Sequence, residues 1–134
     1  MDYREEFYAW YPNLIRPAWT PPSWVFGPVW SVLYTLMAIA LILVIINRAN
    51  HDIAFPVILF IIQLALNAGW VGIFFGLHQI GFAFLEILFL WAAILLTVIA
   101  FWKISQLGAV LLLPYLFWVS FAAVLNFSLW RLNP

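Results

Sequence analysis

The sequence predicts an all-α membrane protein, folded as a compact antiparallel bundle of transmembrane helices with four spans. Of its 134 residues, 68 % are hydrophobic and 7 % are charged, against about 45–50 % and about 25 % in soluble domains. Mean hydropathy is +1.10, and the hydrophobic residues form four long runs. So few charges cannot cover the surface of a soluble enzyme, and this composition also excludes a disordered chain. A net charge of zero and the absence of Cys leave no basic surface for nucleic acid, no disulfide and no zinc–thiolate site.

The four runs cover residues 24–46, 53–75, 80–102 and 107–130. Each is slightly longer than the roughly 20 residues that a helix needs to cross a bilayer. They show none of the alternation that is typical of membrane β-strands. The links between them are short, which makes neighbouring spans antiparallel. We therefore expect a multi-pass integral membrane protein that forms a single domain over residues 1–134.

Prolines dominate the segment that precedes and opens the first run. Pro17, Pro21, Pro22 and Pro28 fall close together, and proline disfavours helix both at its own position and at the residue before it. We expect residues 16–23 to form a stiff, extended lid at the membrane surface. By composition alone, this segment could also be a rigid aromatic anchor.

Several ordered motifs point to one family. Residues 19–30 read WTPPSWVFGPVW, residues 64–70 read LALNAGW, and residues 114–118 read PYLFW. Their order and spacing resemble the translocator protein family, also called tryptophan-rich sensory proteins (TspO/MBR), over about residues 8–133. The resemblance implies five spans, and the helix that precedes the Pro-rich lid in the family is absent here. We expect either a true start upstream of Met1 or a shortened member of the family.

The second run has two contrasting faces at the helical period. One face is polar and aromatic and carries Gln63, Asn67, Trp70 and Phe74. The opposite face carries the small residues Ala65, Gly69, Gly72 and Gly76. Small residues allow close helix approach, so this face either packs within one protomer or joins two copies. Bacterial members of the resembled family are described as dimers through this helix, which implies a homodimer.

The main polar groups inside the predicted spans are Asn67, Glu86 and Asn126. Polar groups in hydrocarbon are functional candidates by default, although each amide could instead be a structural clamp between helices. Glu86 aligns with Phe82, Phe89 and Ala93, so we expect this stripe to face the interior. A partly solvated structural carboxylate is the preferred interpretation of Glu86 over a proton relay.

An antiparallel path brings one end of every span to a common mouth. The residues placed near it are Trp19, Trp24, Phe26, Trp30, Trp70, Phe74, Phe82, Leu125 and Asn126. A further stripe on the last run, of a kind that is usually core, consists of Trp118, Phe121, Ala122 and Leu125. Such a mouth suits a flat, apolar ligand held by stacking and few polar anchors.

The family resemblance supplies a ligand class. Its members bind tetrapyrroles such as protoporphyrin IX and haem, and eukaryotic members bind cholesterol. Carried over by position, the contacts are Phe26, Gly27, Trp30, Phe82, Trp118, Ala122 and Leu125, with Asn67 adjacent. Phe127 stands where the family's cholesterol motif has Tyr, which weakens the sterol interpretation.

The resemblance therefore implies a porphyrin sensor, regulator or carrier, with porphyrin as ligand rather than as obligatory cofactor. One alternative is light-dependent porphyrin degradation that uses the pocket tryptophans. Another is transport of porphyrin or sterol-like ligands. The residues themselves predict no metal cluster and no nucleophile or acid–base pair for catalysis.

Overall fold

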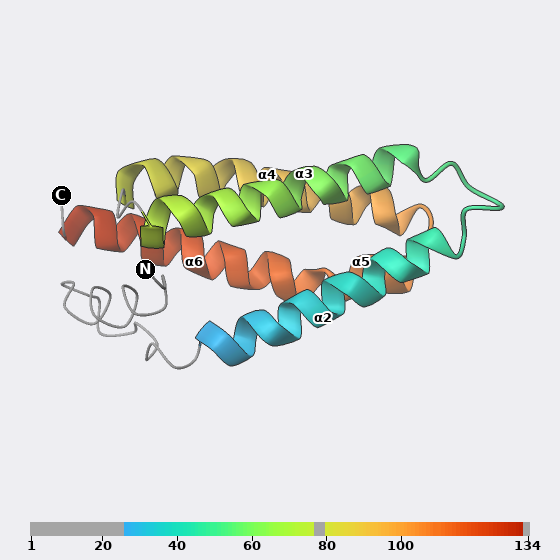
Figure 1. Ribbon diagram of the computed structural model, residues 1–134, viewed down its shortest axis with the longest axis horizontal. Helices are drawn as coiled ribbons and strands as arrows, with labels where there is room; N and C mark the ends of the chain where they lie inside the picture. The colour runs from blue at the N-terminus through green and yellow to red at the C-terminus, as the bar shows by residue number, and fades with distance from the viewer. Residues whose placement is uncertain (1–25, 77–79, 133–134) are drawn as a thin grey trace.

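The computed structural model of the chain describes residues 26–76 and 80–132, and in these ranges every regular element is a helix (Figure 1). The elements are α2 (Phe26–Ile45), α3 (Ala54–Val71), the π-helix η3 (Gly72–Gly76), α4 (Ile80–Trp102), α5 (Gln106–Leu111) and α6 (Leu113–Leu132). Four helical segments are long and apolar enough to cross a membrane: Gly27–Ile45, Ala54–Phe74, Ile80–Trp102 and Gln106–Leu132. The predicted class, a multi-pass helical membrane protein, is confirmed. The predicted lid at residues 16–23 lies outside the described residues.

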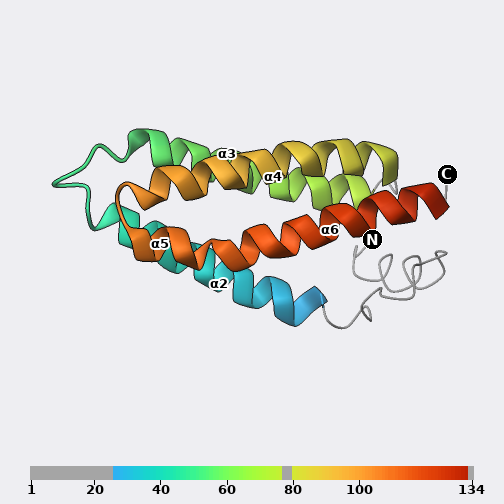
Figure 2. The ribbon, with the colours of Figure 1, turned by 180° about the vertical axis from the view of Figure 1, so that it is seen from behind.

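The helices run antiparallel along one long axis (Figures 1 and 2). The start of α2, the end of η3, the start of α4 and the end of α6 point to the same end of the bundle, as the sequence predicts for the mouth. The links that follow α2 and α4 lie at the opposite end. α4 packs closely against α3 and α6, whereas α2 packs closely against α5 and has little close backbone contact with α3.

Local sequence explains where α3 begins. The Asp52 carboxylate accepts a hydrogen bond from the Ala54 N–H at 3.0 Å, so one of the unpaired amides of the first turn is satisfied. Pro56 falls within that turn, where its missing N–H removes no intrahelical bond. At the other end, the wider π-helix η3 extends α3 toward the mouth, and the periodicity of the sequence does not indicate it.

The last predicted run is not one continuous α-helix. It divides into α5 and α6 at Leu112, two residues before Pro114. Proline has no N–H, and its ring clashes with the carbonyl four residues earlier, so it interrupts regular helix at this point. Ser105 caps α5, because its hydroxyl accepts a hydrogen bond from the Gly108 N–H at 3.1 Å.

Apolar side chains divide between a core and a lipid-facing surface. The core includes Met37, Leu90 and Leu129, each at most 2 % exposed. Ala40 and Gly108 allow α2 and α5 to approach closely, because a Cβ at Gly108 would lie 3.4 Å from the Ala40 carbonyl oxygen. The outward side chains are themselves largely apolar, which a bilayer tolerates and water would not.

Candidate functional site

A buried chain of hydrogen bonds joins three helices at the centre of the bundle. Tyr34 of α2 donates to Asn67 Oδ1, and Asn67 Nδ2 donates to the Tyr115 hydroxyl of α6 at 3.0 Å. Tyr115 in turn donates to Gln63 Oε1 of α3 at 2.7 Å. Gln63 Nε2 lies 3.9 Å from the Met37 sulfur. Gln63, Asn67 and Tyr115 are each 1 % exposed, so these bonds satisfy polar groups that have no water to bind.

Spacing along α3 explains why two amides enter this network. Gln63 and Asn67 are four residues apart and therefore project from the same helix face. The sequence singled out that face as polar, but the prediction missed Tyr34 and Tyr115 as its partners. The signal that could have found them is a phenol within an apolar span, because a buried Tyr hydroxyl usually requires a partner.

A second polar contact lies nearer the mouth. The Trp70 indole N–H donates to Asn126 Oδ1 at 2.9 Å, and Asn126 Nδ2 donates to the Ile80 carbonyl at 2.8 Å. Trp70 also stacks on Phe74, with ring centroids 5.3 Å apart. These contacts tie the ends of α3 and α6 to the first residue of α4. Asn126 therefore joins helices through its amide, as in the alternative interpretation of a structural clamp.

Trp30 of α2 is at the centre of an aromatic cluster that borders the first network. Its ring stacks on Tyr34 at 5.6 Å between centroids and meets the edges of Tyr115 and Trp118 at 6.3 and 6.5 Å. Trp118 continues to Phe121 at 5.5 Å. Trp30, Trp118 and Phe121 are only half-buried, so part of each ring surface is not covered by the described chain. The aromatic cluster consists of Trp30, Tyr34, Tyr115, Trp118 and Phe121.

Other predicted ligand contacts are not members of this cluster. Ala122 and Leu125 are each 4 % exposed and belong to the α6 core. Gly27 is exposed near the start of α2. Phe26 begins α2, and its side chain is outside the described atoms. Trp19 and Trp24 lie outside the described residues.

The expectation that the Phe82, Glu86 and Phe89 stripe faces the interior is wrong for its aromatic members. Phe82 is 68 % exposed and Phe89 is 62 % exposed. The buried face of α4 is the neighbouring one, which carries Ala83, Ile87, Leu90 and Ile94. Successive residues of a helix are about 100° apart around its axis. A shift of one residue between the predicted and the buried face therefore places the phenylalanines on the outer surface.

Glu86 occupies the boundary between those two faces. Both of its carboxylate oxygens are buried, and neither has a hydrogen-bond partner among the residues the structure describes. A Cβ at Gly69 of α3 would lie 3.6 Å from Glu86 Oε1. The carboxylate of Glu86 therefore packs against α3 at this glycine, at a distance that a Cβ would still tolerate.

The small-residue face of α3 is open along most of its length. Ala65, Gly69 and Gly72 are exposed, and a Cβ at Gly72 would meet nothing within 4 Å in the described chain. Gly76 closes η3 at the mouth end. At Gly69 this face borders the carboxylate of Glu86.

The described residues contain no group of three or more His, Cys, Asp or Glu side chains placed to hold a metal ion. Apolar spans, buried amide–phenol bonds and a half-buried cluster of aromatic rings together define a small multi-pass helical membrane protein. The sequence pattern of the TspO/MBR family matches residues 1–131. The chain belongs to this family.

Relatives in bacteria and animals agree with this assignment. The chain is 43 % identical to the tryptophan-rich protein TspO of Chlorobaculum tepidum over 126 residues, which are 93 % of this chain and 80 % of the relative. It is 40 % identical to protein CrtK of Rhodobacter capsulatus, over 94 % of this chain and 79 % of the relative. It is 41 % identical to the human translocator protein, over 92 % of this chain and 75 % of the relative.

Proposed function

We propose that the chain binds a tetrapyrrole, such as protoporphyrin IX or haem, against the aromatic cluster and acts as a sensor, regulator or carrier of porphyrin. The observation that carries this proposal is the half-buried pair Trp30 and Trp118. Flat apolar ligands bind through stacking on such rings, with a few polar groups to fix their orientation. Family membership supports the same ligand class.

The surroundings of the cluster fit a porphyrin. Tyr115 and Asn67 lie behind the rings and are already hydrogen-bonded to each other, so the floor of the site is rigid and its polar groups are satisfied. The ligand therefore meets ring faces rather than unpaired amides. This arrangement favours a large aromatic ligand over a strongly polar one.

Titration of the detergent-solubilised full chain with protoporphyrin IX in the dark, followed by porphyrin absorbance, tests the site. Trp30→Leu and Trp118→Leu should each weaken binding about tenfold, because each removes roughly 1.4 kcal/mol of ring contact. Trp102→Leu is the matched control, since Trp102 is the last residue of α4, is 51 % exposed and does not belong to the aromatic cluster. Equal affinities for all three variants would refute the proposed site.

We further propose that two copies associate through the small-residue face of α3. Ala65 and Gly72 are exposed there, and small residues permit the close backbone approach that drives helix association in membranes. The buried carboxylate of Glu86 beside Gly69 lies at the edge of this face. Cross-linking at Ala65→Cys would detect such a dimer, and a lipid-facing Leu88→Cys variant is the control.

A further inference from the structure

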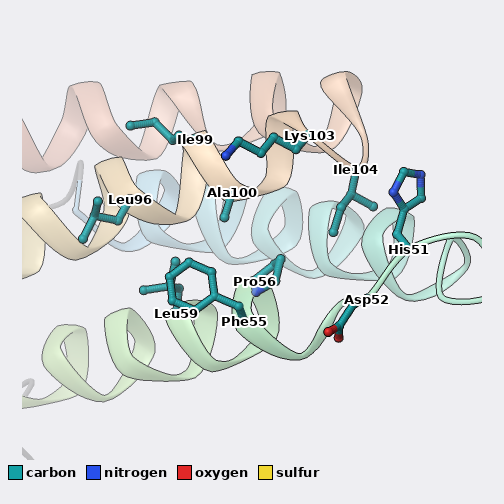
Figure 3. A pocket seen from close by; sticks show the side chains of 10 residues that line it. All are labelled: His51, Asp52, Phe55, Pro56, Leu59, Leu96, Ile99, Ala100, Lys103 and Ile104. Atoms are coloured by element: carbon teal, nitrogen blue, oxygen red, sulfur yellow. The ribbon is translucent and has the colours of Figure 1, made fainter.

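A groove lies at the end of the bundle opposite the mouth. It runs between the start of α3 and the end of α4, below the links that follow α2 and α4 (Figure 3). Its volume is about 330 Å³, within the range of about 300–1,000 Å³ that is typical of ligand pockets. Phe55 and Leu59 form its α3 wall, and Leu96 and Ile99 form its α4 wall.

The groove is open toward the outside of the bundle rather than toward the core. Phe55, Leu96 and Ile99 are 66 %, 52 % and 48 % exposed, whereas Leu59 at the base is 8 % exposed. In a bilayer these outward side chains face acyl chains. The space is therefore accessible from the lipid and is separate from the aromatic cluster.

The polar rim of the groove carries a positive charge without an internal partner. The Asp52 carboxylate at the rim is bonded to the Ala54 N–H, next to the positive end of the α3 dipole. Lys103 is exposed, lines the groove, and forms no ion pair with any residue in the described ranges. His51 also lies at this rim. The rim thus carries one cation and one carboxylate; the carboxylate is held at the start of α3, and Lys103 is available to pair with a negatively charged group.

The depth of these groups in the membrane identifies the kind of ligand. Lys103 directly follows the last residue of α4, and the exposed Trp102 beside it is typical of the membrane interface. A Lys at this level lies among lipid head groups and attracts anionic lipids. The apolar walls of the groove continue from Lys103 toward the hydrocarbon. One amphiphile can therefore contact both the Lys103 ammonium and the apolar walls.

We propose that this groove is a binding site for an anionic phospholipid. One acyl chain lies between Phe55 and Ile99, and the head-group phosphate pairs with Lys103. The proposal is independent of tetrapyrrole binding, because the groove and the aromatic cluster are lined by different residues.

Native mass spectrometry of the full chain tests the proposal, with palmitoyl-oleoyl phosphatidylglycerol and phosphatidylcholine as competing probes. The wild type should retain phosphatidylglycerol preferentially. Lys103→Gln should reduce that preference roughly fivefold, the effect of one cation near the head groups. The control is Arg48→Gln, because Arg48 is exposed in the neighbouring link and does not line the groove.

A second pair of variants tests the apolar walls without touching the charge. Ile99→Trp fills the groove and should reduce retention of both lipids, whereas Leu88→Trp, at a similarly exposed position of α4, should not. Circular dichroism and thermal unfolding establish that all four variants keep the fold.

Three results would overturn the proposal. Equal losses for Lys103→Gln and Arg48→Gln would show only a general charge effect. Equal retention of both lipids by the wild type would show an apolar groove without head-group recognition. Displacement of phosphatidylglycerol by glycerol phosphate or by oleate would assign the site to a free phosphate or to a fatty acid.

Discussion

Replacing Tyr115 by Phe removes the hydroxyl at the centre of the buried network and almost nothing else. The ring remains and keeps its edge contact with Trp30. Two hydrogen bonds are lost, one accepted from Asn67 and one donated to Gln63. Because both partners are 1 % exposed, water cannot replace the hydroxyl without opening the bundle.

The expected size follows from these two bonds. Interhelical hydrogen bonds in membrane proteins contribute about 0.6 kcal/mol on average and at most about 1.7 kcal/mol. Loss of both should lower the free energy of unfolding by about 1–3 kcal/mol. The upper part of that range applies if the Asn67 and Gln63 amides find no new partners, because buried unsatisfied groups are costly.

The assay is reversible unfolding in mixed micelles with increasing dodecyl sulfate, followed by circular dichroism. Tyr34→Phe is the matched control: it also removes one hydroxyl, but that hydroxyl makes one bond of this network and belongs to a residue that is 41 % exposed. Tyr34→Phe should therefore destabilise the protein by half as much or less. In a Gln63→Leu background, Tyr115→Phe should have a smaller effect, because one of its two bonds is already absent.

Destabilisation by Tyr115→Phe that is no larger than that by Tyr34→Phe would refute a central role of the Tyr115 hydroxyl. Additive effects of Tyr115→Phe and Gln63→Leu would refute it too, because additivity means that the two side chains are not coupled.

Three further predictions concern glycines and a helix cap. Gly81→Ala places a Cβ 2.9 Å from the Trp130 indole nitrogen, so it should lower the unfolding free energy by about 1 kcal/mol; an unchanged unfolding midpoint would show that the half-exposed indole simply moves aside. Ser105→Ala removes the cap on the Gly108 N–H and should lower it by about 1 kcal/mol in the same assay, whereas Ser105→Asp should restore most of the loss. A Cβ at Gly72 would meet nothing within 4 Å in the described residues, whereas a bulky side chain there would keep two α3 faces apart. Gly72→Leu should therefore abolish the dimer seen by cross-linking with little effect on monomer unfolding; a dimer that persists in this variant would contradict the proposed interface.

Much of the fold could be predicted because the hydrophobic runs are long and their ends are polar. The run over residues 80–102 coincides with α4. The split of the last run was not predicted, because mean hydropathy does not register the backbone effect of Pro114 at Leu112. The π-helix η3 was missed for a similar reason. Its wider turn changes the backbone hydrogen bonds but not the apolar character of Gly72–Gly76, so hydropathy does not detect it.

The candidate site was predicted in part. The face of α3 with Asn67 and Trp70 is buried and hydrogen-bonded, as its polar character within an apolar span indicated. Phe82 was misplaced because the phase of an almost uniformly apolar helix is poorly defined by hydrophobicity alone. Tyr34 and Tyr115 were missed because the pairing of side chains across helices depends on packing that no single helix encodes.

The packing of α2 has a consequence for the order in which the protein assembles. α3 and α4 are consecutive and pack closely against each other, so they can form a hairpin as soon as both are in the membrane. α2 is synthesised before them, yet its close backbone partner is α5, which emerges after both. We therefore expect α2 to enter the bilayer before its close backbone partner has been synthesised, while α3 and α4 form their hairpin. A nascent chain stopped after Trp102 should hold a finished α3–α4 hairpin and an undocked α2, and the release of α5 and α6 completes the bundle.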